Sequence, residues 1–279
     1  MGTIAVWARL SDLAGTTSAA WRAKDNTRVS GPPRVSIVTP VRNGARYLPE
    51  LIASIRAQDH PDIEHIVVDG GSTDGTLDVL RASGDLRWMS EPDRGMYDAL
   101  GKGLRRATGT IVAYQNADDR YAARDSVSRA VAALAARREA DVVYGDYRVI
   151  DGEGRPLREV RGREFDAAAL TRYNFVPPHS TFLRRRVLDD EGLWPDPGLQ
   201  YCGDWEWFLR LSAAGRVFVH LPEVLSEFRA HRRSKTASTS LLGKTREWSR
   251  VCRRHRLSLA RLVLYEAVLV PLRRRLAGG

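Results

Sequence analysis

The sequence is poor in cysteine. Its 279 residues include only Cys202 and Cys252, which are far apart and form no metal-ligand spacing. Small secreted scaffolds depend on several disulfides, and structural zinc sites use closely spaced cysteine or histidine pairs. Neither class of protein is indicated, and the low cysteine content favours a reducing, cytoplasmic setting.

Long uninterrupted apolar runs are also absent. A membrane-spanning helix needs about 20 consecutive apolar residues. The nearest approach, residues 257–276, is interrupted by Arg261, Glu266 and Pro271 and ends in an arginine cluster, which predicts a helix that lies on a surface. Residues 1–33 lack the apolar stretch and cleavage site of a secretory signal, and we interpret them as an N-terminal extension.

Acidic residues are in deficit. The chain has 44 lysine and arginine residues against 34 aspartate and glutamate residues, with a formal net charge of +10. Such a charge attracts nucleic acid, an anionic membrane face or phosphate-bearing substrates. No nucleic-acid-binding module is recognisable, so we expect no nucleic-acid partner. The basic helical segment 231–279 predicts peripheral contact with an anionic membrane, and a helix packed on the rest of the protein is the alternative.

Repeats and low-complexity tracts are missing as well, and 43% of the residues are hydrophobic, so the chain is expected to bury a substantial core. Strand and helix patterns alternate through the first half. Strands are predicted over residues 34–40, 63–68, 86–89, 109–115 and 141–150, with helices over residues 45–59, 93–109 and 126–140 and around Leu77 and Leu80. This alternation predicts an α/β fold with a mostly parallel, Rossmann-like sheet flanked by helices.

The pattern changes in the second half. Residues 151–154, DGEG, predict a turn between antiparallel strands. Further on, Trp205, Phe208 and Leu209 have the spacing of the inward face of a helix. We therefore predict one main domain over residues 34–230, with a smaller antiparallel portion.

Three polar loops follow predicted strands: VRNG at 41–44, DGGSTDG at 69–75 and NADD at 116–119. In a parallel sheet the carboxyl ends of the strands meet at one edge, where such folds bind their ligands. The three loops are therefore expected to converge on a common cavity.

The third loop carries the adjacent carboxylates Asp118 and Asp119, preceded by Asn116. Adjacent carboxylates repel one another unless a cation or a basic side chain neutralises them. Hard oxygen ligands favour magnesium or manganese, and such ions also bridge substrate phosphates. The alternative is that the two residues cap the following loop.

The second loop begins with Asp69, and its glycines let backbone amides approach a phosphate at the start of a helix. A helix N-cap supplied by Ser72 or Asp74 is the alternative, and both interpretations can hold together. Asp204, at the start of a later helix, is by itself a favourable partner of the helix dipole.

The chain resembles the family 2 glycosyltransferases, which share the GT-A fold, in five blocks of sequence: SIVTPVRNG, IEHIVVDGGSTDGT, SEPDRGMYDALGKGLRRATGTIVAYQNADD, PPHSTF and GDWEWFLRL. The resemblance covers residues 34–229 and is greatest to members that build bacterial surface polysaccharides. It implies an inverting enzyme that moves a sugar from a nucleotide-diphosphate donor to a hydroxyl acceptor. The acceptor would be a glycan or a lipid-linked sugar at the cytoplasmic face of the membrane.

The resemblance also implies site residues. Asp118 and Asp119 would bind a divalent cation, manganese or magnesium, and Asp204 would be the catalytic base that takes the proton of the acceptor hydroxyl. His179 and His231 would lie on the acceptor or phosphate side. The residues implied in nucleotide-sugar binding are Pro40, Arg42, Asn43, Asp69, Gly70, Arg94, Asp98, Asn116 and Asp118.

The chain departs from the family at three positions. Asn116 stands where members often have an aspartate, Gly101 replaces the usual asparagine, and Gly70 replaces a second aspartate that often contacts a uracil base. The changes at Gly70 and Gly101 motivate an alternative, a non-catalytic nucleotide-sugar-binding protein that keeps the fold. A dinucleotide oxidoreductase is excluded because no G-x-G-x-x-G follows the first strand.

Overall fold

The computed structural model describes residues 31–264 apart from residues 85, 190–192, 232–233 and 236–239. Nearly all of the described residues belong to one unit, which begins at Pro33. Most of the predicted N-terminal extension therefore lies outside the described residues, as does the part of the predicted surface helix after Leu264. The predicted boundary after residue 230 stays a prediction.

The first half of this unit is a parallel sheet. Strand β1 (Val35–Val41) pairs with β2 (Ile63–Asp69) on one side and with β4 (Ile111–Tyr114) on the other, and β2 pairs with β3 (Arg87–Ser90). Every one of these pairings is parallel, which confirms the predicted arrangement.

Helices α3 (Leu48–Arg56), α4 (Thr76–Ala82) and α5 (Met96–Arg106) connect these strands. In α3 the apolar residues predicted to share one face are all buried. Glu50 lies in the first turn and Arg56 in the last turn, where their charges interact favourably with the helix dipole. The sequence pattern and the helix ends thus agree.

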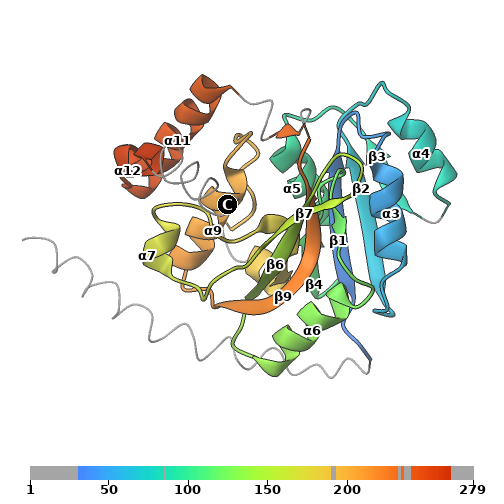
Figure 1. Cartoon of the computed structure of the whole chain (residues 1–279), viewed down its shortest axis with the longest axis horizontal. Helices are drawn as coiled ribbons and strands as arrows, with labels where there is room; N and C mark the ends of the chain where they lie inside the picture. Colours follow the sequence, from blue (N-terminus) through green and yellow to red (C-terminus); the bar gives the residue numbers. More distant parts are fainter. Residues whose placement is uncertain (1–30, 85, 190–192, 232–233, 236–239, 265–279) are drawn as a thin grey trace, which may run out of the picture. The chain divides into compact units, whose positions relative to one another are not determined.

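Strands β1 and β4 of the parallel sheet are buried on both faces. Val38 of β1 belongs to a core cluster with Leu100 of α5, whereas Val35 and Ile37 belong to a second cluster with Leu51 of α3. Successive side chains of a strand point to opposite faces, so α3 and α5 cover opposite sides of the sheet (Figure 1). This packing fixes the carboxyl ends of β1 and β4 at one edge.

The described residues form nine strands in one sheet, in the order β3-β2-β1-β4-β8-β6-β9-β5, with β7 on the edge of β6. The second half adds β5 (Arg120–Tyr121), β6 (Val142–Ile150), β7 (Pro156–Val160), β8 (Thr181–Arg184) and β9 (Phe218–Arg229). β8 is antiparallel to β4 and β6, and the predicted turn joins β6 to antiparallel β7. The mixed sheet confirms the predicted antiparallel portion.

Short helical segments complete the domain: α6 (Ser126–Ala136), α7 (Ala167–Leu170), η1 (Pro178–Ser180), α8 (Arg186–Asp189) and α9 (Gly203–Ala213). Trp205, Phe208 and Leu209 of α9 are buried as predicted. Helix α6 ends four residues earlier than its predicted range of 126–140, because the chain already turns at Arg137 toward β6.

The C-terminal helices α11 (Leu241–His255) and α12 (Leu259–Leu264) pack on this domain (Figure 1). Trp248, Val251 and Cys252 of α11 are buried in the same core cluster as Trp207 of α9. The predicted alternative of a packed helix is therefore confirmed for this segment. None of the helices in the described residues is long and apolar enough to cross a membrane.

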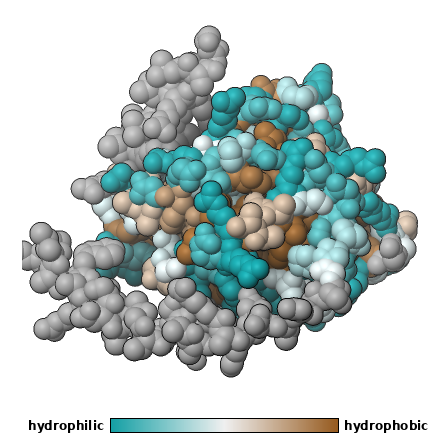
Figure 2. Space-filling view, turned by 90° about the horizontal axis from the view of Figure 1, so that it is seen from below, coloured by the Kyte–Doolittle hydropathy of each residue, from teal (hydrophilic) through white to brown (hydrophobic). Residues whose placement is uncertain are grey.

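The exposed surface is mixed. Figure 2 shows hydrophilic residues over much of the visible face, with hydrophobic patches interrupted by polar side chains. The large hydrophobic side chains exposed in the described part of the chain are scattered over different elements: Trp88, Leu157, Val217, Leu242 and Val263. Single exposed hydrophobic residues of this kind do not mark a docking face.

Candidate active site

The three predicted polar loops meet at one cavity of about 1170 Å³, beyond the carboxyl ends of β1 and β4. This volume is slightly larger than the roughly 300–1,000 Å³ of pockets that bind small molecules. The cavity brings together eight of the residues singled out from the sequence: Pro40, Arg42, Asn43, Asn116, Asp118, His179, Asp204 and His231. The expectation that the acidic loop and Asp204 share one cavity is confirmed for Asp118.

The two adjacent carboxylates are not equivalent. Asp118 lines the cavity, and its Oδ2 lies 2.9 Å from Nε2 of His231. Asp119 is buried and does not line the cavity; it accepts hydrogen bonds from Nδ2 of Asn116 at 2.8 Å and from the backbone N of Arg229 at 2.9 Å. Burial, and then the charge of Asp118, raise the pKa of Asp119 well above its usual value.

Arg229 is the basic side chain that supports this loop, and the sequence did not single it out. It is almost completely buried and donates from Nε to the carbonyl oxygen of Asp118 at 2.9 Å. It also pairs with Glu50 at 2.5 Å and lies over the ring of Tyr47, 4.7 Å from its centroid. These contacts join α3 and β9, which no local motif indicates.

Asp69 holds the second loop in shape and does not reach the cavity. It is fully buried, and its carboxylate accepts hydrogen bonds from the amides of Gly71 and Ser72 and from Oγ of Ser90. These bonds outweigh the effect of burial and lower the pKa of Asp69. In this structure the carboxylate of Asp69 bonds groups of its own loop and Ser90, and its contact with the donor stays a prediction.

The alternative prediction, that Ser72 or Asp74 caps the helix after this loop, is partly confirmed. Gly75 is the N-cap of α4, with φ at +90°, and no side chain caps it, but Asp74 accepts from the backbone N of Thr76 at 3.1 Å. Ser72 and Asp74 also accept from the amides of Asn43 and Ala45. The second loop thereby fixes the first loop, which lines the cavity.

Three more predicted donor residues lie outside the cavity lining. Asp98 accepts from the backbone N and from Nη2 of Arg94, so these two residues are paired with each other. Gly70 faces Asp93, and a Cβ at Gly70 would overlap the Asp93 carboxylate. Asp93 itself lines the cavity and was missed, because a single acidic residue in a turn carries no local signal.

Asp204 is the second residue of α9 and points toward polar partners. Its Oδ1 accepts from the backbone N of Trp205 at 2.8 Å and from the hydroxyl of Tyr97 at 3.2 Å, and its Oδ2 accepts from Nδ2 of Asn174 at 3.2 Å. Burial raises the pKa of Asp204, although the bonds from Trp205 and Tyr97 oppose it. A carboxylate with a raised pKa is a stronger base once it has lost its proton.

Lys235 lines the same cavity, with its Nζ 5.6 Å from the centroid of the Tyr97 ring. Burial lowers the pKa of Lys235, and the charges of Glu247, Asp93 and Asp204 act in the opposite direction. This cation was not predicted, because it lies in a basic segment whose residues look alike in sequence.

His179 is buried in the cavity wall and is a neutral group. Its Nδ1 lies 2.9 Å from Oγ of Ser226, and its ring stacks on Phe228 with centroids 5.4 Å apart. Burial lowers the pKa of His179 to about 3. His179 therefore contributes a hydrogen-bonding ring at neutral pH and no positive charge.

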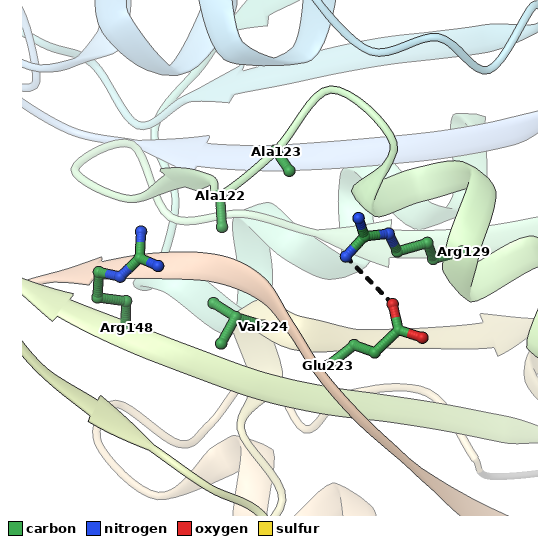
Figure 3. A pocket seen from close by; sticks show the side chains of 6 residues that line it. All are labelled: Ala122, Ala123, Arg129, Arg148, Glu223 and Val224. Carbon is green, nitrogen blue, oxygen red and sulfur yellow. Dashed lines mark ion pairs between the residues drawn. The ribbon is translucent and has the colours of Figure 1, made fainter.

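A second depression lies between α6 and β9 and is shown in Figure 3, but it is a poor candidate site. Its charged side chains are already paired: Arg129 with Glu223 at 3.1 Å, and Arg148 with Glu227 at 2.8 Å. None of the residues of the three predicted loops lines it. In the described part of the chain, no group of three or more His, Cys, Asp or Glu side chains is arranged to hold a metal by itself.

Known proteins resemble this chain in sequence. Residues 36–192 match the family model described as Glycosyl transferase family 2. A PGL/p-HBAD biosynthesis glycosyltransferase of Mycobacterium bovis is 32% identical over 185 residues, which cover 64% of this chain and 69% of the relative. An uncharacterized glycosyltransferase of Rickettsia typhi is 32% identical over 219 residues, 75% of this chain and 67% of the relative.

Solved structures share the fold. Residues 1–349 of S. aureus TarS in complex with UDP-GlcNAc superpose with a TM-score of 0.66 at 20% identity, over 83% of this chain and 66% of that chain. The mannosyltransferase PcManGT from Pyrobaculum calidifontis in complex with GDP-Man and Mn²⁺ gives a TM-score of 0.64 at 23% identity, over 85% and 71%. The chain thus spans slightly less than two thirds of the TarS fragment, and the likeness shows the predicted GT-A fold.

Proposed function

The chain belongs to glycosyl transferase family 2, and we propose that it moves one sugar, with inversion, from a nucleoside-diphosphate donor to a hydroxyl acceptor. One observation carries this proposal: Asp118 and Asp204 line the same cavity, one beyond β4 and the other at the start of α9. A sugar ring between them would have the diphosphate at one end and the acceptor hydroxyl at the other.

Asp204 is the proposed catalytic base. The acceptor oxygen attacks the anomeric carbon and its proton passes to an Asp204 oxygen. The bond between the anomeric carbon and the diphosphate oxygen breaks, and its electron pair leaves with the diphosphate. The hydrogen bonds from Tyr97 and Asn174 hold the carboxylate in one orientation for this step.

Asp118 and His231 are the proposed holders of a divalent cation, manganese or magnesium. Their Oδ2 and Nε2 atoms are 2.9 Å apart in the cavity wall, and Oδ1 of Asn116 in the same loop is buried without a hydrogen-bond partner among the described residues. Such an ion needs only one or two carboxylates, because waters and substrate phosphates fill its remaining positions. When bound, it would neutralise charge on the leaving diphosphate.

In this proposal Asp119 positions the acidic loop instead of binding the ion. Both of its oxygens accept hydrogen bonds from the protein, and it is not part of the cavity lining. The Mn²⁺ in the structure of PcManGT supports a cation in this fold. The experiment below, with manganese or magnesium, decides which ion the chain uses.

Asp93 is the proposed contact for the nucleobase. Its Oδ1 accepts from the backbone N of Gly95 at 2.8 Å, and its Oδ2 points to the space that a side chain at Gly70 would occupy. The carboxylate that the family usually has at residue 70 is thus supplied from a different loop. A carboxylate there would accept a hydrogen bond from a ring or amino N–H of the base.

The acceptor is proposed to be a glycan or a lipid-linked sugar on the cytoplasmic side of a membrane. The name of the M. bovis relative supports glycolipid synthesis, and UDP-GlcNAc in the TarS structure supports a nucleotide-sugar donor. The exposed arginines of α11 would favour an anionic membrane surface.

The test is a panel of nucleotide sugars with manganese or magnesium. Thermal stabilisation identifies the donor, because a ligand that binds the folded chain stabilises it more as the ratio of ligand concentration to Kd rises. Release of nucleoside diphosphate with acceptor then measures transfer. Asp204→Asn should abolish transfer and keep donor binding, and Asp118→Asn should weaken both.

Asp78→Asn is the matched control, since Asp78 is an exposed carboxylate on α4 that pairs only with Arg81 in the described part of the chain. Full turnover by Asp204→Asn would refute the assignment of the base. Donor binding without any turnover by the unmodified chain would favour the non-catalytic binding protein instead.

A further inference from the structure

Glu247 of α11 is bonded to the loop that leads into the catalytic helix. Its Oε1 accepts from the backbone N of Gln200 at 2.5 Å, and its Oε2 accepts from the backbone N of Tyr201 at 2.7 Å and of Cys202 at 3.1 Å. Three consecutive amides therefore converge on one carboxylate. Cys202 is the N-cap of α9, so these amides lie immediately before the first turn of the helix, and the side chain of Cys202 does not cap it.

This loop touches the proposed active site at several points. Gln200 and Tyr201 line the cavity, and Asp204 follows two residues after the loop ends. The hydroxyl of Tyr97 has one proton, which is shared between the carbonyl oxygen of Tyr201 at 3.3 Å and Oδ1 of Asp204 at 3.2 Å. A displacement of the loop would therefore change the hydrogen bonding of the base.

The loop also contacts the segment that precedes α5. The side-chain amide of Gln200 donates to the carbonyl oxygen of Arg94, next to Gly95, where any side chain would meet Gln200. On the other side, Lys244 lies 4.8 Å from the centroid of the Tyr201 ring, and Trp248 packs edge-on against the same ring. Helix α11 thus holds this loop through the carboxylate of Glu247 and through the contacts of Lys244 and Trp248 with the Tyr201 ring.

We propose that Glu247 is a positioning residue of the transferase: by holding the amides of Gln200, Tyr201 and Cys202, it sets the place of Asp204 in the cavity. The proposal rests on the function proposed above for Asp204. It also extends the functional unit past the predicted boundary at residue 230, since α11 would be required for turnover and not only for attachment.

The alternative is that Glu247 only stabilises the fold. Arg254 of α11 separates the two cases, because it also ties this helix to the domain, through Asp196 at 2.7 Å and Glu206 at 2.9 Å, without contacting the amides of the loop. Arg254→Ala is therefore the matched control. Glu247→Gln keeps the shape but replaces one acceptor oxygen by an NH₂ donor, and Glu247→Asp keeps the charge on a shorter arm.

The first measurement is amide hydrogen exchange in the full chain without substrate. In Glu247→Gln the amides of residues 200–202 should exchange at least about tenfold faster, since local opening sets their protection. Arg254→Ala should leave them protected. Unchanged protection in Glu247→Gln would overturn the proposal, whatever the chain proves to transfer.

The second measurement is steady-state transfer with the nucleotide sugar that the panel identifies. Glu247→Gln should lower kcat about tenfold or more, because a misplacement of about 1 Å can cost a hundredfold. The Kd of UDP or GDP with manganese should change less than about twofold, because the acidic loop is held by other contacts. Glu247→Asp should recover part of kcat and serves as the test if Glu247→Gln does not fold.

An equal fall of kcat in Glu247→Gln and Arg254→Ala would show a general loss of stability and overturn the proposal. Failure of the proposed function gives a different result: the unmodified chain would bind UDP or GDP and show no transfer with any donor. The exchange experiment would still decide whether Glu247 holds the loop.

Discussion

Tyr97 donates its hydroxyl to Oδ1 of Asp204 at 3.2 Å, across the 107 residues that separate them in sequence. The bond favours the charged form of the carboxylate, whereas burial favours the neutral form and raises the pKa of Asp204. The pKa of the proposed base thus balances burial against several hydrogen bonds and the charge of Lys235, and a substitution of Tyr97 removes one of these bonds.

Tyr97→Phe should shift the acidic limb of the pH profile of kcat upward. Without the hydroxyl, the pKa of Asp204 rises further, so a smaller fraction of the base is ionised at a given low pH. A hydrogen bond of about 1 kcal/mol corresponds to a shift of about 0.7 pH units. The loss of rate should therefore shrink as the pH is raised.

The control is Tyr121→Phe, which changes a buried tyrosine of β5 that does not line the cavity. Its profile should match that of the unmodified chain. If the acidic limb of the Tyr97→Phe pH profile stays in place or moves to lower pH, Asp204 is not the group whose ionisation controls turnover.

Asp93→Ala should weaken selection among nucleoside diphosphates. If Asp93 accepts an N–H from the base, its loss should raise the Kd of the preferred nucleotide by about tenfold to a hundredfold, as for a hydrogen bond to a charged group. Calorimetry with UDP, GDP, CDP and ADP would measure this. Glu153→Gln, another acid in the cavity lining, should leave the order of preference unchanged.

An unaltered preference in Asp93→Ala would remove Asp93 from base recognition. Gly70→Asp is a complementary variant, because its new side chain would displace the Asp93 carboxylate. It should change the preference as well, since the two carboxylates cannot share one position.

Removal of a ligand from the proposed cation site should raise the metal requirement. For His231→Gln we expect the manganese concentration for half-maximal transfer to increase at least about tenfold, and a chelator should abolish transfer by the unmodified chain. Titration of manganese in the presence of UDP or GDP, followed by calorimetry, would check the same change without turnover. Manganese affinity equal to that of the unmodified chain would exclude His231 as a ligand.

Local sequence patterns predicted the parallel half of the fold because its elements are defined within short windows. The apolar spacing in α3 and the β-branched run of β1 each fix an element with no reference to the rest of the chain. Strand β5 has only two residues and no such pattern, and it forms because Arg120 and Tyr121 pair with Glu227 and Ser226 of β9. Long-range pairing of this kind cannot be seen in a window.

The site shows the same division. Asp118 and Asp204 belong to motifs, and the sequence found both. Arg229 and Glu247 act by reaching backbone atoms of distant segments, a carbonyl of the acidic loop and three amides before α9. Any basic or acidic residue at the right place could do this, so no residue type or spacing marks them.

Glu206 gives a stability prediction that is independent of the proposed chemistry. Burial would raise its pKa, but hydrogen bonds from His255 and Arg254 and the charge of Arg210 outweigh it and lower the pKa from 4.5 to about 2. A carboxyl with a lowered pKa stabilises the folded chain above pH 4.5, and this contribution is lost as the pH falls toward 2.

Glu206→Gln should therefore lower the free energy of unfolding at pH 7 by about 3 kcal/mol, at about 1.4 kcal/mol per pKa unit. Urea denaturation at pH 7 and at pH 3 measures the difference, which should be smaller at pH 3. Glu223→Gln removes an exposed pair with Arg129 and should cost less than about 1 kcal/mol at either pH. A Glu206→Gln penalty that is the same at both pH values would show that lost packing, and not the ionised carboxylate, accounts for the role of this residue between α9 and α11.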